Sequence, residues 1–111
     1  MSFKLRDRIK NDTSEKVVFT LTLNSSPIDL TGATMRCQFR KAHKVGVLVK
    51  TVSIGSGLTV ATPSSGIFEL DSFICDFDAC LYWYDIETTF PDGTVKTYIQ
   101  GTMTVLQDVT N

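Results

Sequence analysis

The chain has 111 residues, of which 42% are hydrophobic and 21% are charged, and its formal net charge is −1. This composition is typical of one folded globular domain over residues 1–111 and excludes an intrinsically disordered chain. The near-neutral charge argues against a nucleic-acid-binding protein, which usually has a clear basic excess. No apolar run reaches the roughly 18 residues that a membrane helix needs.

Charge is divided unevenly along the chain. Residues 1–50 hold ten Lys or Arg and four Asp or Glu, a balance of +6, whereas residues 51–111 hold one and eight, a balance of −7. If the fold separates these halves, copies of the protein could associate head to tail. If the fold interleaves them, opposite charges meet within one chain. The sequence leaves both arrangements open.

The N-terminal stretch FKLRDRIK has cations at every second position. In an extended strand, Lys4, Arg6, Arg8 and Lys10 would share one face. This basic face is a candidate interface for an acidic protein neighbour or for phosphate, or it protects a sheet edge from pairing with other chains. The stretch also lacks the apolar region of a secretory signal, so we expect synthesis in a cytoplasm.

Apolar and polar residues alternate through the next two segments. Residues 16–23 (KVVFTLTL) and 34–41 (TMRCQFRK) each place their apolar side chains on one face, with Met35, Cys37 and Phe39 inward. This alternation is typical of half-buried antiparallel strands. The intervening residues include the turn formers Asp29 and Gly32.

The second half of the chain continues this pattern with one interruption. Residues 71–81 (DSFICDFDACL) do not alternate, and their apolar spacing of four predicts a connector with one helical turn. Residues 80–90 and 95–106 predict a long hairpin, joined by a turn that contains Asp92 and Gly93. Gly101 within the second of these strands suggests a bulge or a close backbone approach. The whole chain is therefore predicted to be an all-β sandwich of about seven or eight strands with at most one short helical turn.

Few residues suggest catalysis or metal binding. The chain has an odd number of cysteines, and their spacing is not that of metal ligands. We therefore expect Cys37, Cys75 and Cys80 to be free thiols. The single histidine, His43, lies in a polar loop and is expected to be solvated. We therefore expect no enzyme, no catalytic residues, no cofactor and no metal site.

The aromatic run Tyr82, Trp83, Tyr84 has two interpretations. In the first, Trp83 lies in the core and the two tyrosines lie at the rim or on the outer face. In the second, the run is a stacking platform for sugars or bases. A face bearing Tyr82 and Tyr84 would also suit a protein interface.

The order of four motifs resembles a small structural domain found in bacteriophages. The motifs are PIDLTGATMRCQFRK, GSGLTV, SSGIFEL and LYWYDIETTFPDGTVKTYIQGTMTVLQDVT. Together they are similar to the N-terminal domain of phage baseplate upper proteins and to related immunoglobulin-like domains encoded among tail genes, and the similarity covers about residues 16–110. The matching positions are Asp29, Leu30, Thr31 and Gly32 in the DLTG turn, Tyr84, Asp85 and Ile86 in the long strand, and Gly93 and Gly101.

This resemblance implies an antiparallel immunoglobulin-like β-sandwich that serves as a virion structural protein. Its expected place is the tail, baseplate or neck, with other virion proteins and further copies of itself as partners and no membrane. The alternatives are a capsid decoration protein and a carbohydrate-binding or host-adhesion module that binds a glycan. Baseplate proteins continue into further domains whereas this chain stops at Asn111, so a stand-alone subunit is expected. Residues 107–111 (QDVTN) are a further candidate contact.

Overall fold

The computed structural model describes residues 4–43 and 46–107, and in this part of the chain the fold is all-β. The candidate contact over residues 107–111 therefore lies, apart from its first residue, outside the described residues. The elements are β1 (Arg8–Ile9), β2 (Thr13–Ser14), β3 (Val17–Thr20), β4 (Thr22–Leu23), β5 (Ser26–Pro27), β6 (Thr34–Lys41), β7 (Leu48–Ile54), β8 (Gly57–Thr62), the 3-10 turn η1 (Pro63–Ser65), β9 (Ile67–Leu70), β10 (Phe73–Ile74), β11 (Cys80–Thr89) and β12 (Val95–Leu106).

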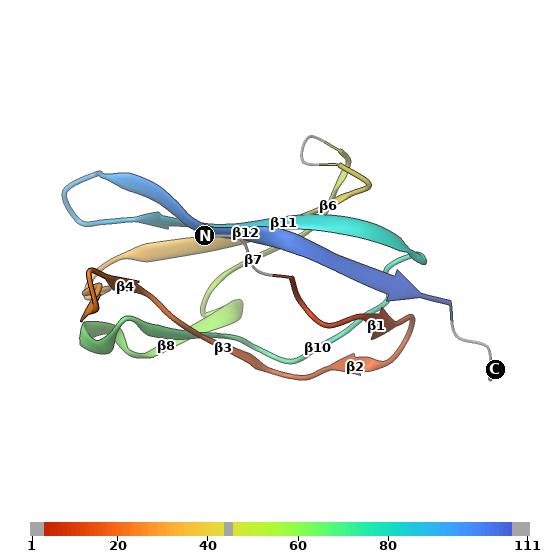
Figure 1. The fold of residues 1–111 in the computed structure, drawn as a ribbon, viewed down its shortest axis with the longest axis horizontal. Coiled ribbons are helices and arrows are strands. Elements are labelled where there is room, and N and C mark those ends of the chain that lie inside the picture. The colour runs from red at the N-terminus through yellow and green to blue at the C-terminus, as the bar shows by residue number, and fades with distance from the viewer. Residues whose placement is uncertain (1–3, 44–45, 108–111) are drawn as a thin grey trace.

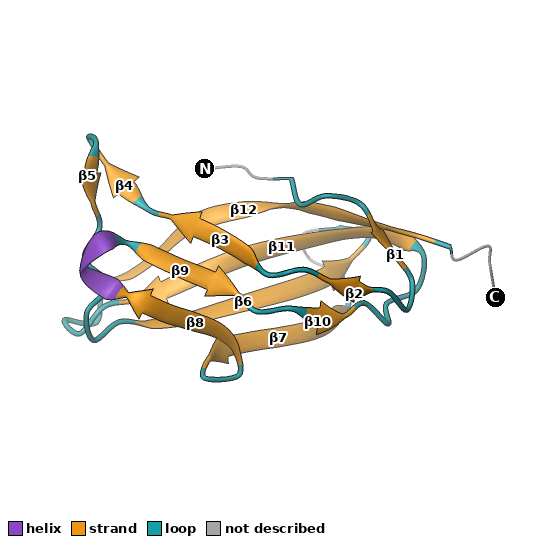
Figure 2. Ribbon diagram, turned by 90° about the horizontal axis from the view of Figure 1, so that it is seen from below, coloured by secondary structure: helices purple, strands orange, loops and turns teal. Residues whose placement is uncertain are grey.

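Eight of these strands form one curled sheet in the order β1-β12-β11-β6-β7-β8-β9-β3 (Figure 2). Two small two-stranded sheets, β10-β2 and β4-β5, complete the fold. Most neighbours in the large sheet are antiparallel, but β1 runs parallel to β12, and β7 runs parallel to β8 over two residue pairs. The sheet is therefore mixed, with β1 and β3 at its two ends.

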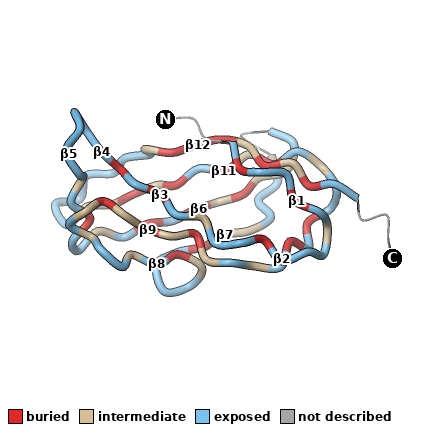
Figure 3. Tube along the Cα trace, turned by 60° about the horizontal axis from the view of Figure 1, so that its bottom comes forward, coloured by how far each residue is buried: buried red, intermediate tan, exposed pale blue. Residues whose placement is uncertain are grey.

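The curl brings the two parts of the sheet face to face. Figure 1 shows β6, β11 and β12 in one layer and β3, β8 and β10 in the other. Buried positions alternate along the strands, as the red bands of Figure 3 show, so the inward side chains of both layers meet between them. Met35, Cys37 and Phe39 are buried, which confirms the inward face predicted for β6. On the inner face of one layer, Phe19 of β3 stacks on its cross-strand neighbour Phe68 of β9, with ring centroids 5.1 Å apart.

The hairpin of β11 and β12 is the longest pairing in the molecule, and it confirms the two strands predicted at the end of the chain. Its ladder shifts register between Ile86 and Glu87, because Ile86 pairs with Ile99 whereas Glu87 pairs with Thr97. The bulged residue is therefore Tyr98. The sequence suggests a bulge or a close backbone approach at Gly101. The structure shows no bulge there, because Gly101 pairs in regular register with Tyr84.

Residues 71–81 do not form the predicted helical turn. Phe73 and Ile74 form β10 instead, and they pair antiparallel with β2. The backbone N–H of Cys75 donates to the carbonyl of Asp12 (2.8 Å), and the N–H of Asn11 donates to the carbonyl of Cys75 (2.7 Å). These hydrogen bonds to a distant segment replace the local ones that a helix requires.

Two aspartates hold turns by bonding to the backbone. Asp29 Oδ1 accepts hydrogen bonds from the Thr31 N–H (2.9 Å) and from the Thr31 hydroxyl (2.6 Å), which lower the pKa of Asp29. Asp92 Oδ1 accepts a bond from the Thr94 N–H (2.9 Å). The glycines of these turns, Gly32 and Gly93, have φ values of +75° and +89°, which a residue with a Cβ adopts only with strain.

Candidate protein-binding surface

The N-terminal cations do not share one face. Lys4 and Arg6 are exposed, whereas Arg8 is buried and keeps only 7% of its surface accessible. The predicted continuous basic face is wrong, because only Arg8–Ile9 pair with β12 and residues 4–7 form no strand. Leu5 and Arg8, three residues apart, are the buried pair in this segment.

Arg8 has a positively charged side chain in a largely buried position. Its Nε donates a 2.6 Å hydrogen bond to Ser14 Oγ, and its Nη1 donates to the carbonyl oxygen of Arg6 at 3.0 Å. Among the described residues, no carboxylate forms an ion pair with Arg8 and no group accepts a hydrogen bond from its Nη2. A buried charge without an opposite partner is unfavourable. An anion that reached this guanidinium would therefore be bound favourably.

A hollow of about 470 Å³, which Arg8 helps to line, lies between two segments of the chain. It is lined by Lys4, Leu5, Arg6, Arg8, Glu15, Lys16, Val17 and Val18. Four of these residues are cations and one is a carboxylate, so the lining is strongly positive, while Leu5, Val17 and Val18 add an apolar wall. We call these eight residues the basic hollow. Sequence reasoning missed its second side because nothing local signals that residues 15–18 lie opposite residues 4–8.

The exposed cations of the basic hollow are held by ion pairs at the surface. The pairs are Lys4–Asp7 (3.8 Å), Arg6–Glu15 (2.7 Å) and Lys16–Glu69 (3.4 Å). The pKa of Glu15 is lowered by a hydrogen bond from its own backbone N–H and by the Arg6 guanidinium. Exposed ion pairs typically contribute only about 0–1 kcal/mol, so they exchange readily for contacts with another molecule.

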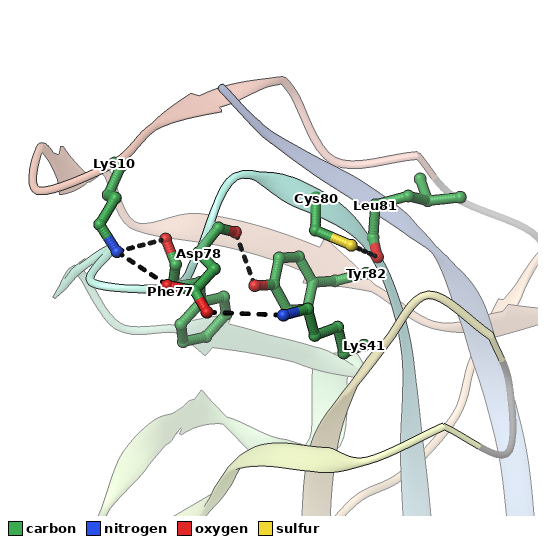
Figure 4. Close-up of polar contacts among 7 residues, drawn as sticks. All are labelled: Lys10, Lys41, Phe77, Asp78, Cys80, Leu81 and Tyr82. Carbon is green, nitrogen blue, oxygen red and sulfur yellow. Dashed lines mark hydrogen bonds and ion pairs between the residues drawn. The ribbon is translucent and has the colours of Figure 1, made fainter. Parts of the chain in front are cut away.

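Lys10, the last of the N-terminal cations, is bound within its own chain (Figure 4). Its Nζ lies 3.2 Å from Asp78 Oδ1, and Lys41 Nζ lies 3.5 Å from Asp78 Oδ2. Hydrogen bonding and charge from Lys10, and then from Lys41, lower the pKa of Asp78. Charges from the basic and acidic halves therefore meet inside one chain at this point.

Tyr82 and Tyr84 point into the core, so the interpretation that places them at the rim or on the outer face is wrong. They keep 1% and 3% of their surface, whereas Trp83 between them is only half-buried and lies on the outer face of β11. Tyr84 stacks on Phe39 (5.7 Å between centroids), and Tyr82 packs on Phe77 (5.0 Å). Burial raises the pKa of both phenols. Neither tyrosine is available for an interface on this chain as it stands.

Trp83 lies on the outer face of β11, and most of its neighbours there are polar. A shallow depression of about 30 Å³ there is lined by Gln38, Arg40, Trp83, Tyr84, Asp85 and Gln100. Three neighbouring strands supply these residues, because Asp85 pairs with Gln38 of β6 on one side and with Gln100 of β12 on the other. The depression brings Trp83 together with the hydrogen-bonding side chains of Gln38, Arg40, Asp85 and Gln100.

The described residues contain no group of three or more His, Cys, Asp and Glu side chains that could hold a metal ion. His43 is exposed. The three cysteines are free thiols, with Cys37 and Cys75 buried and Cys80 partly exposed, as the sequence predicts. Within the same ranges, no helix is long and apolar enough to cross a membrane.

The chain matches no protein-family model, and no curated protein sequence matches it. The basic hollow and the Trp83 face are therefore candidate sites on structural grounds alone.

Proposed function

We propose that this chain is a non-enzymatic structural subunit of a bacteriophage particle, placed in the tail, baseplate or neck. In this proposal it acts through contacts with other virion proteins and with copies of itself in a symmetric assembly. The motif order from Pro27 to Thr110 supports the phage assignment. The basic hollow is the observation that carries the contact role, because it combines a positive lining with an apolar wall at the surface.

The finer fold assignment within this proposal is an immunoglobulin-like sandwich. The order β12-β11-β6-β7 corresponds to the G-F-C-C′ sheet of such domains, and the order β8-β9-β3 corresponds to their D-E-B strands. Tyr82 supports it further, because its hydroxyl bonds to the carbonyl four residues upstream, near the start of the strand that corresponds to F. The two short parallel pairings are the departure from a fully antiparallel arrangement.

Quantitative mass spectrometry of purified phage particles, scaled to the major capsid protein, tests the location. A low copy number that matches a ring or a few trimers would support the tail, baseplate or neck. A copy number close to that of the capsid protein would make the chain a capsid decoration protein instead. Absence from the particle would refute the structural role.

Incorporation of surface variants tests the role of the basic hollow. Arg6→Glu with Lys16→Glu reverses two exposed charges of the lining. We expect this variant to be lost from particles, because like charges across an interface repel. Lys96→Glu is the control for a single charge reversal elsewhere, since Lys96 is exposed on β12 and does not line the hollow. Equal incorporation of both variants would contradict contact through the basic hollow.

A carbohydrate-binding module is the second candidate, and the Trp83 face favours it. A flat tryptophan with amide and carboxylate neighbours suits a sugar ring, which stacks by its apolar face and hydrogen-bonds by its hydroxyls. In this candidate the site is Trp83, because Tyr82 and Tyr84 are buried. Retention on a glycan array that is lost in Trp83→Ala, while the variant stays folded, would support this candidate over the assembly role.

A further inference from the structure

We propose that the basic hollow binds an extended acidic segment of a partner protein, which adds as a strand to the outer edge of β3. This inference deepens the proposed function and rests on it for the partner being another protein of the particle. It specifies the chemistry of the partner segment and the way it binds.

Among the described residues, β3 is an edge strand. It pairs there with β9 and with no other strand, and it forms the end of the eight-stranded sheet. Its residues Val17 and Val18 line the basic hollow, and Val18 is 55% exposed. Open strand edges offer rows of N–H and C=O groups that pair with an added strand. An extended segment in the hollow would therefore find backbone partners along β3.

The charge of the hollow selects an acidic segment. Lys4, Arg6 and Lys16 line the hollow, and Arg8 adds a largely buried side chain whose Nη2 donates no hydrogen bond to the described residues. A carboxylate placed there would accept a charge-assisted hydrogen bond and compensate the buried charge. The exposed pairs that it displaces, such as Arg6–Glu15, contribute little in water.

A polypeptide fits these features better than a nucleic acid does. The wall formed by Leu5, Val17 and Val18 matches apolar side chains that alternate with carboxylates along a strand. A phosphate backbone has acceptors but no regular N–H donors for the carbonyl groups of β3. The net charge of −1 also gives a nucleic acid no long-range attraction.

Fluorescence anisotropy with a labelled peptide tests the inference on the full-length protein. The probe is a short peptide of alternating Glu and Val, and its control has Gln in place of each Glu. We expect the acidic peptide to bind, and binding to weaken as salt is added. We expect at least about tenfold weaker binding for Arg6→Glu with Lys16→Glu, and no change for Lys96→Glu, which makes the same kind of charge change away from the hollow.

A second pair of peptides tests strand addition itself. N-methylation of alternate residues along one peptide edge removes its N–H donors but keeps every carboxylate. If the segment pairs with β3, methylation of one edge abolishes binding and methylation of the other edge does not. Equal binding of both methylated peptides would overturn strand addition. Equal binding of the Glu and Gln peptides would overturn the acidic assignment.

Two further outcomes would also overturn the inference. Tighter binding of a single-stranded oligonucleotide than of the acidic peptide would mean that the hollow recognises polyanions in general. Self-association that is lost in Arg6→Glu with Lys16→Glu would make a second copy of the chain the occupant.

Peptide binding by a protein that is absent from particles would refute the proposed function alone. Presence in particles without peptide binding would refute this inference alone.

Discussion

The hydroxyl of Tyr82 donates a 2.6 Å hydrogen bond to the backbone carbonyl of Asp78, four residues earlier in the chain. The bond fixes the turn through which the chain enters β11, and Figure 4 shows the side chain of Asp78 then turned toward Lys10 and Lys41. The ring of Tyr82 packs on Phe77 within the same turn. Residues 77–82 therefore connect the N-terminal segment, through Lys10, and β6, through Lys41, to the start of β11.

Tyr82→Phe should lower the free energy of unfolding by about 0.5–1.5 kcal/mol, the net contribution of a typical hydrogen bond. The substitution keeps the ring but leaves the carbonyl of Asp78 without its hydroxyl donor. Tyr98→Phe is the matched control, because no described residue hydrogen-bonds the half-buried Tyr98 hydroxyl. Urea unfolding followed by Trp83 fluorescence measures both. An equal effect of the two substitutions would show that the hydrogen bond contributes nothing.

Stability should fall at alkaline pH because of the same phenol. Burial raises the pKa of Tyr82 to about 12 from an ordinary value of 10.0. Because the folded pKa is above the unfolded one, the contribution is fully present below about pH 10 and is lost as pH rises toward 12. Urea unfolding at about pH 9 and about pH 11 measures the decline. Tyr82→Phe should decline less steeply, and an unchanged slope would assign the effect to other groups, such as the buried Tyr84.

Strict alternation and strong turns made part of the fold predictable. The strands β6, β11 and β12 lie where the sequence predicts them, because their inward residues recur at every second position and the turn at Asp92 and Gly93 fixes their ends. Residues 71–81 could not be predicted in this way. Phe73 and Phe77 have helical spacing, yet their segment bonds to Asn11 and Asp12, which no local pattern reveals.

The candidate site was harder to predict than the strands, because it is formed by contacts between residues that are distant in the sequence. Alternation correctly places Trp83 and the two tyrosines on opposite faces of β11, but it does not say which face is buried. The tyrosines are inward because Tyr82 finds a carbonyl partner and both rings find aromatic neighbours. The burial of Arg8 likewise follows from the parallel pairing of β1 with β12, between segments almost a whole chain length apart.

Two glycines of one tight connection should differ in their tolerance of alanine. Gly55 and Gly57 have φ values of +85° and +105°, so alanine is strained at either position. A Cβ on Gly57 would also lie 2.6 Å from the Cβ of Val52, whereas a Cβ on Gly55 would meet nothing within 4 Å. We expect Gly55→Ala to lower the free energy of unfolding by about 1–2 kcal/mol and Gly57→Ala to lower it by clearly more. Thermal unfolding of both variants measures this, and equal losses would contradict the predicted clash.

Thiol labelling should separate the three cysteines. Cys80 is partly exposed, whereas Cys37 and Cys75 are buried and burial raises the pKa of both thiols. Because the thiolate is the reactive form, Cys80 should react first with a thiol reagent in the native protein, and the other two only after unfolding. Cys80→Ser should remove the fast phase. A fast phase that persists in this variant would show that the region around Cys75 opens in the native state.

Thr88→Val should stabilise the protein, which is unusual for a core substitution. Thr88 is fully buried in β11, and within the described residues its hydroxyl oxygen has no hydrogen-bond partner. Valine has nearly the same shape and an equal preference for strands, so the change removes an unsatisfied polar group without opening a cavity. We expect a gain of about 1 kcal/mol in urea unfolding. Thr89→Val, at the next and partly exposed position, should change stability little. A loss of stability in Thr88→Val would mean that the hydroxyl is bonded in solution, most simply by a water molecule in the core.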